Sequence, residues 1–596
     1  MGKKRIKEKK KNKKEKIKKD EKIEENKADF FLDDEDADLA YNSSELEEEE
    51  EKEEFSEHGS DLDFNEEDYE SSEEEKKTKK KEKFMSREEL KKLINKTKNG
   101  NSFAINKLLI LFNQITNQSN NINFEDNEDN ILSKPKLILK LINFCIEEIP
   151  NILQLKFNSK DNIIKNDNHS LIKRYLSILV KYLKSTENTM KEFIFNNIDN
   201  LSNLIFLYSN FSEIFLKIGL KIWSTTTIEK LRKSILTFVK NLIIKKNQFF
   251  ELSIKLFYIN YLDIAKSMNI QSYNHIKTLQ NDIIDILQYD LQKSYITIFT
   301  FIRKLCIQLR LTIIDKTSSS IKLIYNWQFI NSIILWGRVI IKYYNNKDIA
   351  LLLYPLIQTI IGVIRLNYGE QFYLLRIRLV MLLNHLSKIS GIFIPIAMYI
   401  LPILKSNYFI EKCKIINSPN LEKLKKKKKI KEEDLEKKKI ENNEKKINKR
   451  INIYVMLKIK PDEYKIKQIR KDLLEEACDC LLEFLSIHSN KIIFEELSYD
   501  ILKGMRSALK NIYDKEYREI IKNRKEKIEK NIEEIRNKIQ NFKGKDLILT
   551  EYNTLIDFEK KYIIGDFYKE FDNISHKREA NFEALKHQKE NKFIEV

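Results

Sequence analysis

The segment L-I-K-R-Y-L-S-I-L-V-K-Y-L, residues 171–183, shows the apolar periodicity from which the fold class can be predicted. Its apolar residues recur three and four positions apart, so they share one face of a helix and leave the lysines and the arginine on the other. That face comprises Leu171, Ile172, Tyr175, Leu176, Leu179, Val180 and Leu183. Similar stripes continue through 201–222, 228–245, 250–265 and 280–310. The sequence therefore predicts a succession of amphipathic helices.

Glycine and proline are scarce in this chain. Its 596 residues include 11 glycines and seven prolines, against average usage of about 7% and 5%. All-β and α/β folds need such residues at their turns and βα loops, whereas helices can be joined by asparagine- and serine-containing turns. A chain of this length is too long to fold around a single compact hydrophobic core. We therefore expect an all-α fold, specifically an α-solenoid of HEAT- or armadillo-like repeats, although no clean repeat period is found.

Charge is strongly segregated along the chain. Lys and Arg number 108 and Asp and Glu 90, a net charge of +18, which favours polyanionic partners such as RNA. Residues 1–27 are lysine-rich, 28–75 are acidic with Lys52 as their single Lys or Arg, and another lysine cluster follows. Such blocks bury too little apolar area to fold, so a disordered tail is predicted over 1–85. Candidate RNA-binding or nuclear-import residues are Lys3, Lys4, Arg5, Lys9, Lys10 and Lys11.

The remaining chain divides by composition. The predicted parts are an N-terminal helical repeat array at 86–290, a helical core at 291–405, a low-complexity charged insertion at 406–450, C-terminal helical repeats at 451–515 and a charged helical extension at 516–596. Ser86–Glu89 reads S-R-E-E, the pattern of a capping box. In the extension, a narrow seam is formed by Ile521, Ile528, Ile532, Ile535 and Ile539. It fits a short coiled-coil arm, a helix on a partner, or a solvated helix anchored to the array.

No catalytic or membrane-spanning pattern stands out. Dinucleotide, P-loop, zinc-protease and nucleophile-elbow motifs are not found. Cys478 and Cys480, with His488 nearby, lack zinc-ligand spacing, and His385 fits helix packing better than general-base chemistry. The apolar run Ile392–Leu404 is too short to span a bilayer. We therefore expect a protein without enzymatic activity, cofactor, metal, small-molecule substrate or membrane partner.

The stretch 325–404 contains the most informative residues. Trp327 and Trp336 share one amphipathic segment, and Pro355 could begin a helix at its first position. Gly362, inside an isoleucine-rich helix, allows close helix approach. Three arginines interrupt this apolar region: Arg365, Arg376 and Arg378. Partly buried arginines either pair with carboxylate or carbonyl oxygens or face a bound anion such as RNA, and both alternatives remain open here.

Several of these blocks resemble one protein family. They are Y-N-W-Q-F-I at 325–330, Y-P-L-I-Q-T-I-I-G-V-I-R-L at 354–366 and the segment Ser387–Pro395. The segments Phe301–Arg310 and Leu481–Leu497 are also similar, and together the blocks resemble the nucleolar complex protein 2 family over about 290–515. The candidate partner or core residues are Trp327, Trp336, Tyr354, Pro355, Gly362, Arg365, Arg376, Gly391, Pro395, Phe494 and Glu496.

The resemblance implies a function that composition could not show. It implies a non-catalytic scaffold, in the nucleolus and nucleoplasm of the nucleus, for maturation and intranuclear transport of the large (60S) ribosomal subunit precursor. The implied partners are sister nucleolar complex proteins, as a heterodimer, and the pre-ribosome with its pre-rRNA. A transport-receptor or adaptor solenoid is the alternative, and it leaves the lysine-rich tail unexplained. An RNA-modifying enzyme would need a cofactor loop that the sequence does not show.

Overall fold

The computed structural model describes residues 87–118, 135–157, 162–366, 369–410, 450–543 and 566–594. Within these residues every regular element is an α-helix or a short 3-10 helix, which confirms the all-α prediction. The tail 1–85, with its six candidate cations, and residues 411–449 of the predicted insertion lie outside the described residues. The chain divides into two compact units, Met1–Ile264 (unit 1) and Ala265–Val596 (unit 2). The finer six-part division stays a prediction.

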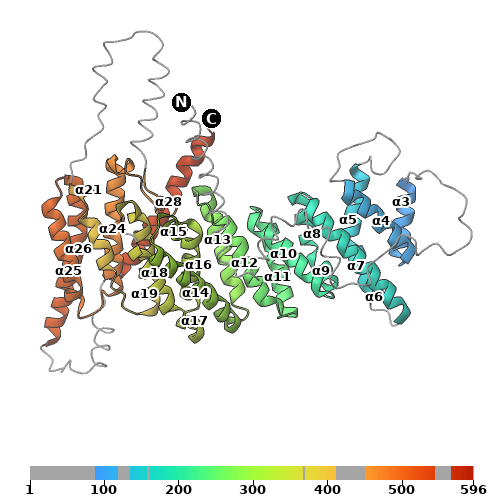
Figure 1. The fold of residues 1–596 in the computed structure, drawn as a ribbon, viewed down its shortest axis with the longest axis horizontal. Helices are drawn as coiled ribbons and strands as arrows, with labels where there is room; N and C mark the ends of the chain where they lie inside the picture. The colour runs from blue at the N-terminus through green and yellow to red at the C-terminus, as the bar shows by residue number, and fades with distance from the viewer. Residues whose placement is uncertain are drawn as a thin grey trace, which may run out of the picture. The chain divides into compact units, whose positions relative to one another are not determined.

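Unit 1 is a layered set of helices. Its helices are α3 (Arg87–Lys98), α4 (Ser102–Gln118), α5 (Pro135–Glu147), α6 (Ile149–Phe157), α7 (Asn162–Ser185), α8 (Asn188–Asn196), α9 (Ile198–Ile205), α10 (Ser209–Thr225), α11 (Glu229–Lys245) and α12 (Phe249–Ile264). Each packs on neighbours close in sequence, such as α4 on α7 and α10 on α11 and α12 (Figure 1). The contacts are therefore mostly local, as expected of stacked helices.

The stripe that predicted the fold lies in α7. Six of its seven apolar residues are buried, and Val180 is half-buried. Ile178 and Tyr182, which the stripe did not include, are also buried. The buried face is wider than the stripe because α7 contacts α4, α6 and α10 rather than one neighbour. Glu88 and Glu89 lie in the first turn of α3, as the capping-box pattern suggested, but Ser86 is outside the described residues.

Unit 2 contains the blocks singled out in the sequence. Its elements are α13 (Ile270–Leu287), α14 (Leu291–Asp315), α15 (Ser318–Ile324), α16 (Trp327–Tyr343), α17 (Lys347–Leu351), α18 (Leu353–Leu366), η3 (Glu370–Phe372), α19 (Tyr373–Ser390), α20 (Ala397–Leu404), α21 (Asn407–Ile410), η4 (Glu463–Lys465), α24 (Lys467–Ile487), α25 (Phe494–Asn511), α26 (Lys515–Lys543), η5 (Asp566–Lys569) and α28 (Glu570–Ile594). Helix α24 is central: it packs against α19, α20, α26 and α28 (Figure 1).

Polar side chains start several of these helices without the help of glycine. The carboxylate of Asp290 accepts a hydrogen bond from the Lys293 N–H at 3.1 Å at the start of α14. The side chain of Asn326 accepts one from the Phe329 N–H at 2.7 Å at the start of α16. Each satisfies a backbone donor that the helix leaves unpaired. Helix α19 ends at Gly391, whose φ of +69° places it in the left-handed region.

The isoleucine seam of the extension lies in α26. Ile521 and Ile528 are fully buried, and Ile532 and Ile535 are nearly so. The helix packs on α24 and α25 of the same chain. Of the three alternatives for the seam, the packing agrees with a helix anchored to the array rather than with a coiled-coil arm, because helices of this chain cover the seam.

One described stretch, Lys347–Leu366, is long and apolar enough to cross a membrane when judged by length and composition alone. It comprises α17 and α18, and half of it is buried. Leu356, Ile360 and Val363 are fully buried, and α18 packs on α14, α16 and α19. A core helix needs the same apolar composition, so packing accounts for it.

Candidate functional site

Two family-like blocks that are far apart in sequence meet at one end of unit 2. The block Ser387–Pro395 covers the end of α19 and its connection to α20. The block Leu481–Leu497 covers the end of α24 and the start of α25. The Phe393 ring lies 5.8 Å from that of Phe484 and 5.4 Å from that of His488, measured between centroids. The fold therefore brings the two blocks into contact.

The turn after α19 exposes apolar side chains. The Gly391 N–H donates to the Ser387 carbonyl at 2.9 Å, which ends the helix. The Ser387 hydroxyl then donates to the Ile392 carbonyl at 2.7 Å. Beyond this turn Ile392 and Phe393 stay about half exposed, at 48% and 51%. A left-handed residue is needed here, and glycine provides it without a Cβ clash.

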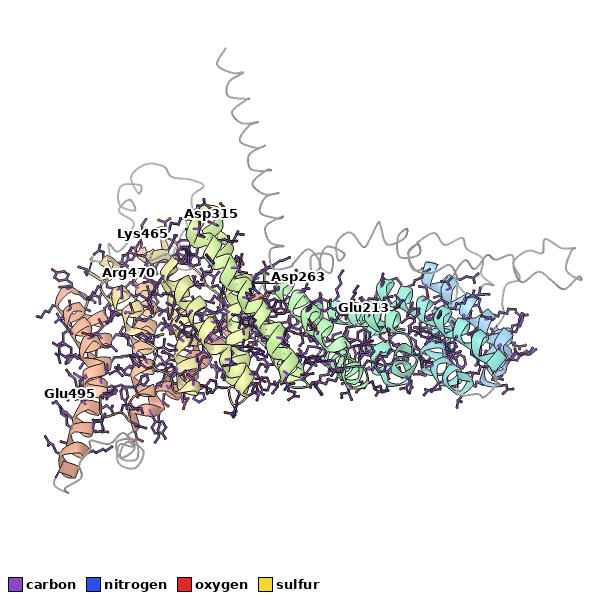
Figure 2. The ribbon with its side chains drawn as sticks, turned by 60° about the horizontal axis from the view of Figure 1, so that its bottom comes forward. Glu213, Asp263, Asp315, Lys465, Arg470 and Glu495 are labelled. Carbon is purple, nitrogen blue, oxygen red and sulfur yellow. The ribbon has the colours of Figure 1, made fainter. Side chains whose placement is uncertain are left out.

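We name this exposed region the end surface and define it by Ile389, Ile392, Phe393 and Ile493. Ile493, which precedes α25, is 63% exposed and Ile389 is 46% exposed. In Figure 2, Glu495, two residues after Ile493, is labelled low on unit 2, whereas Lys465 and Arg470 are labelled nearer its upper edge. The contacts of Phe393 with Phe484 and His488 bring together the two segments that carry these exposed residues. Exposed apolar surface on a folded protein often marks an interaction site when it is contiguous.

The start of α28 borders the end surface. The Lys388 ammonium lies 2.7 Å from the Asp572 carboxylate and 4.1 Å from the centroid of the Phe571 ring. The Phe567 ring, in η5, packs edge-on against that of Phe494 at 5.8 Å. Phe494, a candidate residue from the sequence, is fully buried by such contacts. It therefore supports the end surface from beneath.

A buried charge network fixes α28 to α24. The Arg578 side chain, 3% exposed, lies 2.7 Å from the Glu476 carboxylate and also pairs with Glu483, which is 1% exposed. Burial raises the pKa of Glu483, and the nearby Arg578 guanidinium opposes that rise. The Asn384 amide donates to the Glu483 carboxylate at 3.3 Å, which adds α19 to the network. Such a network positions three helices around one set of charges.

A second pair of ionic contacts extends the network to α26. Asp479, on α24, lies 3.1 Å from Arg524 on α26 and 3.0 Å from Lys577 on α28. Sequence reasoning did not single out these charged residues. The available signal was the spacing of Glu476, Asp479 and Glu483, which puts three carboxylates on one face of the helix, among the apolar residues of its C-terminal half.

The other candidate residues do not form one site. Trp336 is fully buried, and its ring stacks on that of Phe301 at 5.6 Å between centroids. A Cβ added at Gly362 would lie 2.7 Å from a Leu309 methyl, so α18 and α14 do approach closely there. Pro355 is the third residue of α18 rather than the first. The exposed candidates are Tyr354, Arg365, Gly391, Pro395 and Glu496.

The three arginines have different surroundings. Arg378 is buried, donates to the Ile453 carbonyl at 3.5 Å and to that of Tyr454, and lies 5.0 Å from the Trp327 ring centroid. Arg376 is 4% exposed, and its guanidinium carbon lies 5.4 Å from the centroid of the Tyr373 ring. Arg365 is exposed, over the Tyr399 ring at 5.7 Å. The Arg378 guanidinium therefore pairs with backbone carbonyl oxygens and lies against an aromatic ring.

Burial shifts the pKa values of the cysteine and the two histidines that the sequence analysis considered as candidates for chemistry. Burial raises the pKa of Cys478 to about 12, so its reactive thiolate is scarce at neutral pH. Burial lowers the pKa of His385 and of His488 to about 4 in each case. Among the described residues, no group of three or more His, Cys, Asp or Glu is placed to hold a metal ion.

One cavity of about 240 Å³ lies between α24, α28 and residues 450–454. Its charged lining residues are Arg450, Asp472, Glu475, Glu476, Lys577 and Arg578. Burial raises the pKa of Asp472, whose carboxylate accepts a hydrogen bond from the Ile451 N–H at 3.1 Å. Charges of both signs largely compensate one another here, which favours a structural role for the cavity.

Comparison with known proteins identifies relatives. Nucleolar complex protein 2 of Drosophila melanogaster is 24% identical over 361 residues, covering 60% of this chain and 43% of that protein. Nucleolar complex-associated protein 2 of Arabidopsis thaliana is 26% identical over 416 residues, covering 67% and 50%. Protein REBELOTE of Arabidopsis thaliana is 35% identical over 127 residues, covering 21% of each chain. The chain thus spans about half the length of the first two curated relatives.

A family model provides the broader match. The model of the Noc2p family matches residues 248–566, which include all the blocks that carried the resemblance. The end surface and the charge network's residues on α19, α24 and α26 lie within that range. Because the match extends over more than half of the chain, this protein belongs to the Noc2p family.

Proposed function

We propose that this chain is a non-enzymatic nucleolar scaffold that supports maturation and intranuclear transport of the large (60S) ribosomal subunit precursor. Membership of the Noc2p family supports a nucleolar role in ribosome biogenesis. Relatives are named nucleolar complex proteins, which supports nucleolar and nuclear localisation. Presence in the nucleoplasm is part of the proposal, since transport of the precursor would pass through it. In this proposal the chain acts with sister nucleolar complex proteins and uses no cofactor, metal or small-molecule substrate.

We further propose that the described helices form an α-solenoid of the HEAT or armadillo type. Helix α14 packs on both α16 and α18, and α16 packs in turn on α18 and α19. Contact between helices that are near neighbours in the chain is the pattern expected of stacked helical pairs. A stack of this kind offers extended surfaces to large partners rather than one enclosed pocket.

The observation that carries the proposal is the meeting of two family-like blocks at the end surface. Phe393 and Ile493 come from the two blocks, and each exposes more than half of its surface area. Covering water-exposed apolar side chains with a partner lowers the free energy of the complex, because apolar surface is removed from water. We therefore assign the sister-protein contact to the end surface.

RNA contact is assigned to the lysine clusters of the tail, including Lys3, Lys4 and Arg5. Cations that neutralise phosphates release counterions, so association with pre-rRNA should weaken steeply as salt rises. Replacing the six candidate tail cations by glutamine should reduce the slope of log affinity against log salt by about 0.7 for each phosphate that is no longer neutralised. An unchanged slope would remove the tail from the RNA-binding surface.

Affinity purification of the tagged full chain from nuclear extract tests the proposal. We expect large-subunit precursor RNA and a second nucleolar complex protein to copurify. Recovery of neither, or a nuclear-rim signal by microscopy, would support the transport-receptor alternative instead.

A matched pair of variants tests the end surface separately. Phe393→Asp with Ile493→Asp should lose the second protein, because burying a carboxylate in an apolar interface is costly. Tyr513→Asp is the control, since Tyr513 is 70% exposed and lies beyond α25, away from the end surface. If both variants retain the second protein equally, the surface assignment is wrong while the scaffold role stands. Thermal melting of each variant verifies folding.

A further inference from the structure

The outward side of α14 is a long apolar face that no described helix covers. Its apolar residues are Ile296, Phe299, Ile307, Leu311 and Ile314, and they are between 40% and 68% exposed. The opposite side of the same helix is buried, with Ile298 and Leu305 fully covered. Spacings of three, four, seven and eleven residues place the exposed set on one stripe. Asp315 marks the C-terminal end of this helix in Figure 2.

The same face carries only positive charge. Arg303 and Arg310 are exposed and lie within the stripe, seven residues apart, which is about 10.5 Å along a helix. Neither makes an ion pair with a residue that the structure describes. No aspartate or glutamate occurs between residues 291 and 314. The single carboxylate of α14 is that of Asp315, its last residue, so the two guanidinium groups stand in an apolar stripe without a paired carboxylate of their own helix.

We propose that this α14 outer face binds an amphipathic helix of another protein, one whose apolar stripe is bordered by carboxylates about seven residues apart. An apolar stripe of five large side chains matches the contact made when one helix lies along another. Arginine pairs with carboxylates through two parallel hydrogen bonds, so the two guanidinium groups fix the register and direction of the partner helix.

Other occupants fit the face less well. A second copy of α14 would bring arginines against arginines, and no acidic residue between positions 291 and 314 could neutralise them. RNA would satisfy the two arginines but would leave the apolar residues between them without apolar partners. An acidic amphipathic protein helix satisfies both kinds of residue at once.

The α14 outer face is distinct from the end surface. Its residues belong to α14, whereas the end surface is formed by the last turn of α19 and by the connections from α19 to α20 and from α24 to α25. The inference therefore stands or falls without regard to the sister-protein assignment.

Peptide binding to the full chain provides the first test. The probe is a labelled helical peptide of roughly three heptads with leucines along one stripe and two glutamates seven residues apart beside it. The control peptide carries glutamine at these two positions. By fluorescence anisotropy, we expect the glutamate peptide to bind at least tenfold more tightly than the control, with the difference shrinking at high salt. Equal affinities would overturn the proposal.

Charge reversal in the chain provides the second test. The variant Arg303→Glu with Arg310→Glu should lose at least tenfold in affinity for the glutamate peptide and gain affinity for a lysine version of it. Arg518→Glu, at an exposed arginine on α26, is the matched control and should change neither affinity. Loss of binding without the gain for the lysine peptide would contradict direct pairing.

Crosslinking in cells identifies the natural occupant. A photoreactive amino acid replaces the exposed Ile307 in the full chain, and the crosslinked peptide is sequenced. We expect a helical segment of another protein with an apolar stripe and at least two Asp or Glu residues seven apart. A crosslink to RNA, to a second copy of this chain or to a segment without that pattern would overturn the proposal, as would the absence of any crosslink.

Discussion

Removal of the buried Arg578 guanidinium is the sharpest perturbation that the structure offers. Arg578 joins α28 to the carboxylates of Glu476 and Glu483 on α24, and its side chain is only 3% exposed. The variant Arg578→Met keeps most of the side-chain length while leaving Glu483, at 1% exposure, without its cation. Removing one partner of a buried ion pair costs about 3–5 kcal/mol, because an uncompensated charge stays buried. The affected element is α28, which this contact holds in place.

Hydrogen exchange of α28 measures the effect directly, since local opening free energies appear in amide protection. A loss of about 3–5 kcal/mol lowers the protection factors of α28 by roughly two to four orders of magnitude, at 1.36 kcal/mol per tenfold change. Arg536→Met is the control, because the pair that Arg536 forms with Glu495 is exposed and should matter little. Unchanged protection of α28 in the Arg578 variant would refute the assigned role of the network.

The loss of α28 protection in Arg578→Met should depend on pH, because it depends on the ionisation of Glu483. Burial raises the pKa of its carboxyl group, and loss of the opposing Arg578 charge raises it further. An acid whose pKa is higher in the folded state contributes stability at low pH and loses it as pH rises through that pKa. The stability deficit of Arg578→Met should therefore grow as pH rises above 4.5, the ordinary pKa of a glutamate, after correction for intrinsic exchange. The added substitution Glu483→Gln should restore part of the protection, and no restoration would contradict the pairing.

Three further predictions concern the helical core. Gly337→Ala should lower the melting temperature more than Gly362→Ala, because its Cβ would meet three Leu382 side-chain atoms at 2.8–3.2 Å rather than one methyl group at 2.7 Å. Trp336→Ala should cost about 3–5 kcal/mol in urea unfolding, because a fully buried aromatic ring is lost. His385 should destabilise the fold as pH falls from about 6.5 towards 4, because its folded pKa of about 4 lies below its unfolded value. His385→Phe should reduce that acid sensitivity of the melting temperature.

The fold class could be predicted because helical periodicity is a local property. Residues 171–183 repeat their apolar residues at helical spacing, and six of the seven are buried in α7. Helices α24 and α25 lie within residues 451–515, where the sequence predicts helices. The close approach at Gly362 was also predictable, since a residue without a side chain inside an apolar helix usually marks a place where another helix comes near.

The surface that packs against the isoleucine seam could not be predicted from the sequence. The spacing of Ile521, Ile528 and Ile532 predicts an apolar seam that another surface must bury. The spacing does not indicate whether that surface belongs to this chain or to a partner. The structure supplies it from α24 and α25 of the same chain. Likewise, the sequence grouped Trp336, Phe494 and Pro395 as one set of candidates, and the structure buries the first two and exposes the third.

The helical class, the charged tail and the family-like blocks could all be recognised from the sequence, because periodicity, composition and motif order are properties of the linear chain. The folded structure was needed to show that residues 387–395 and 481–497 meet at the end surface. It alone paired Arg578 with Glu483, which lie 95 residues apart. Contacts over such separations depend on how whole helices pack, and the free energy of packing is shared among many side chains rather than encoded in any one segment.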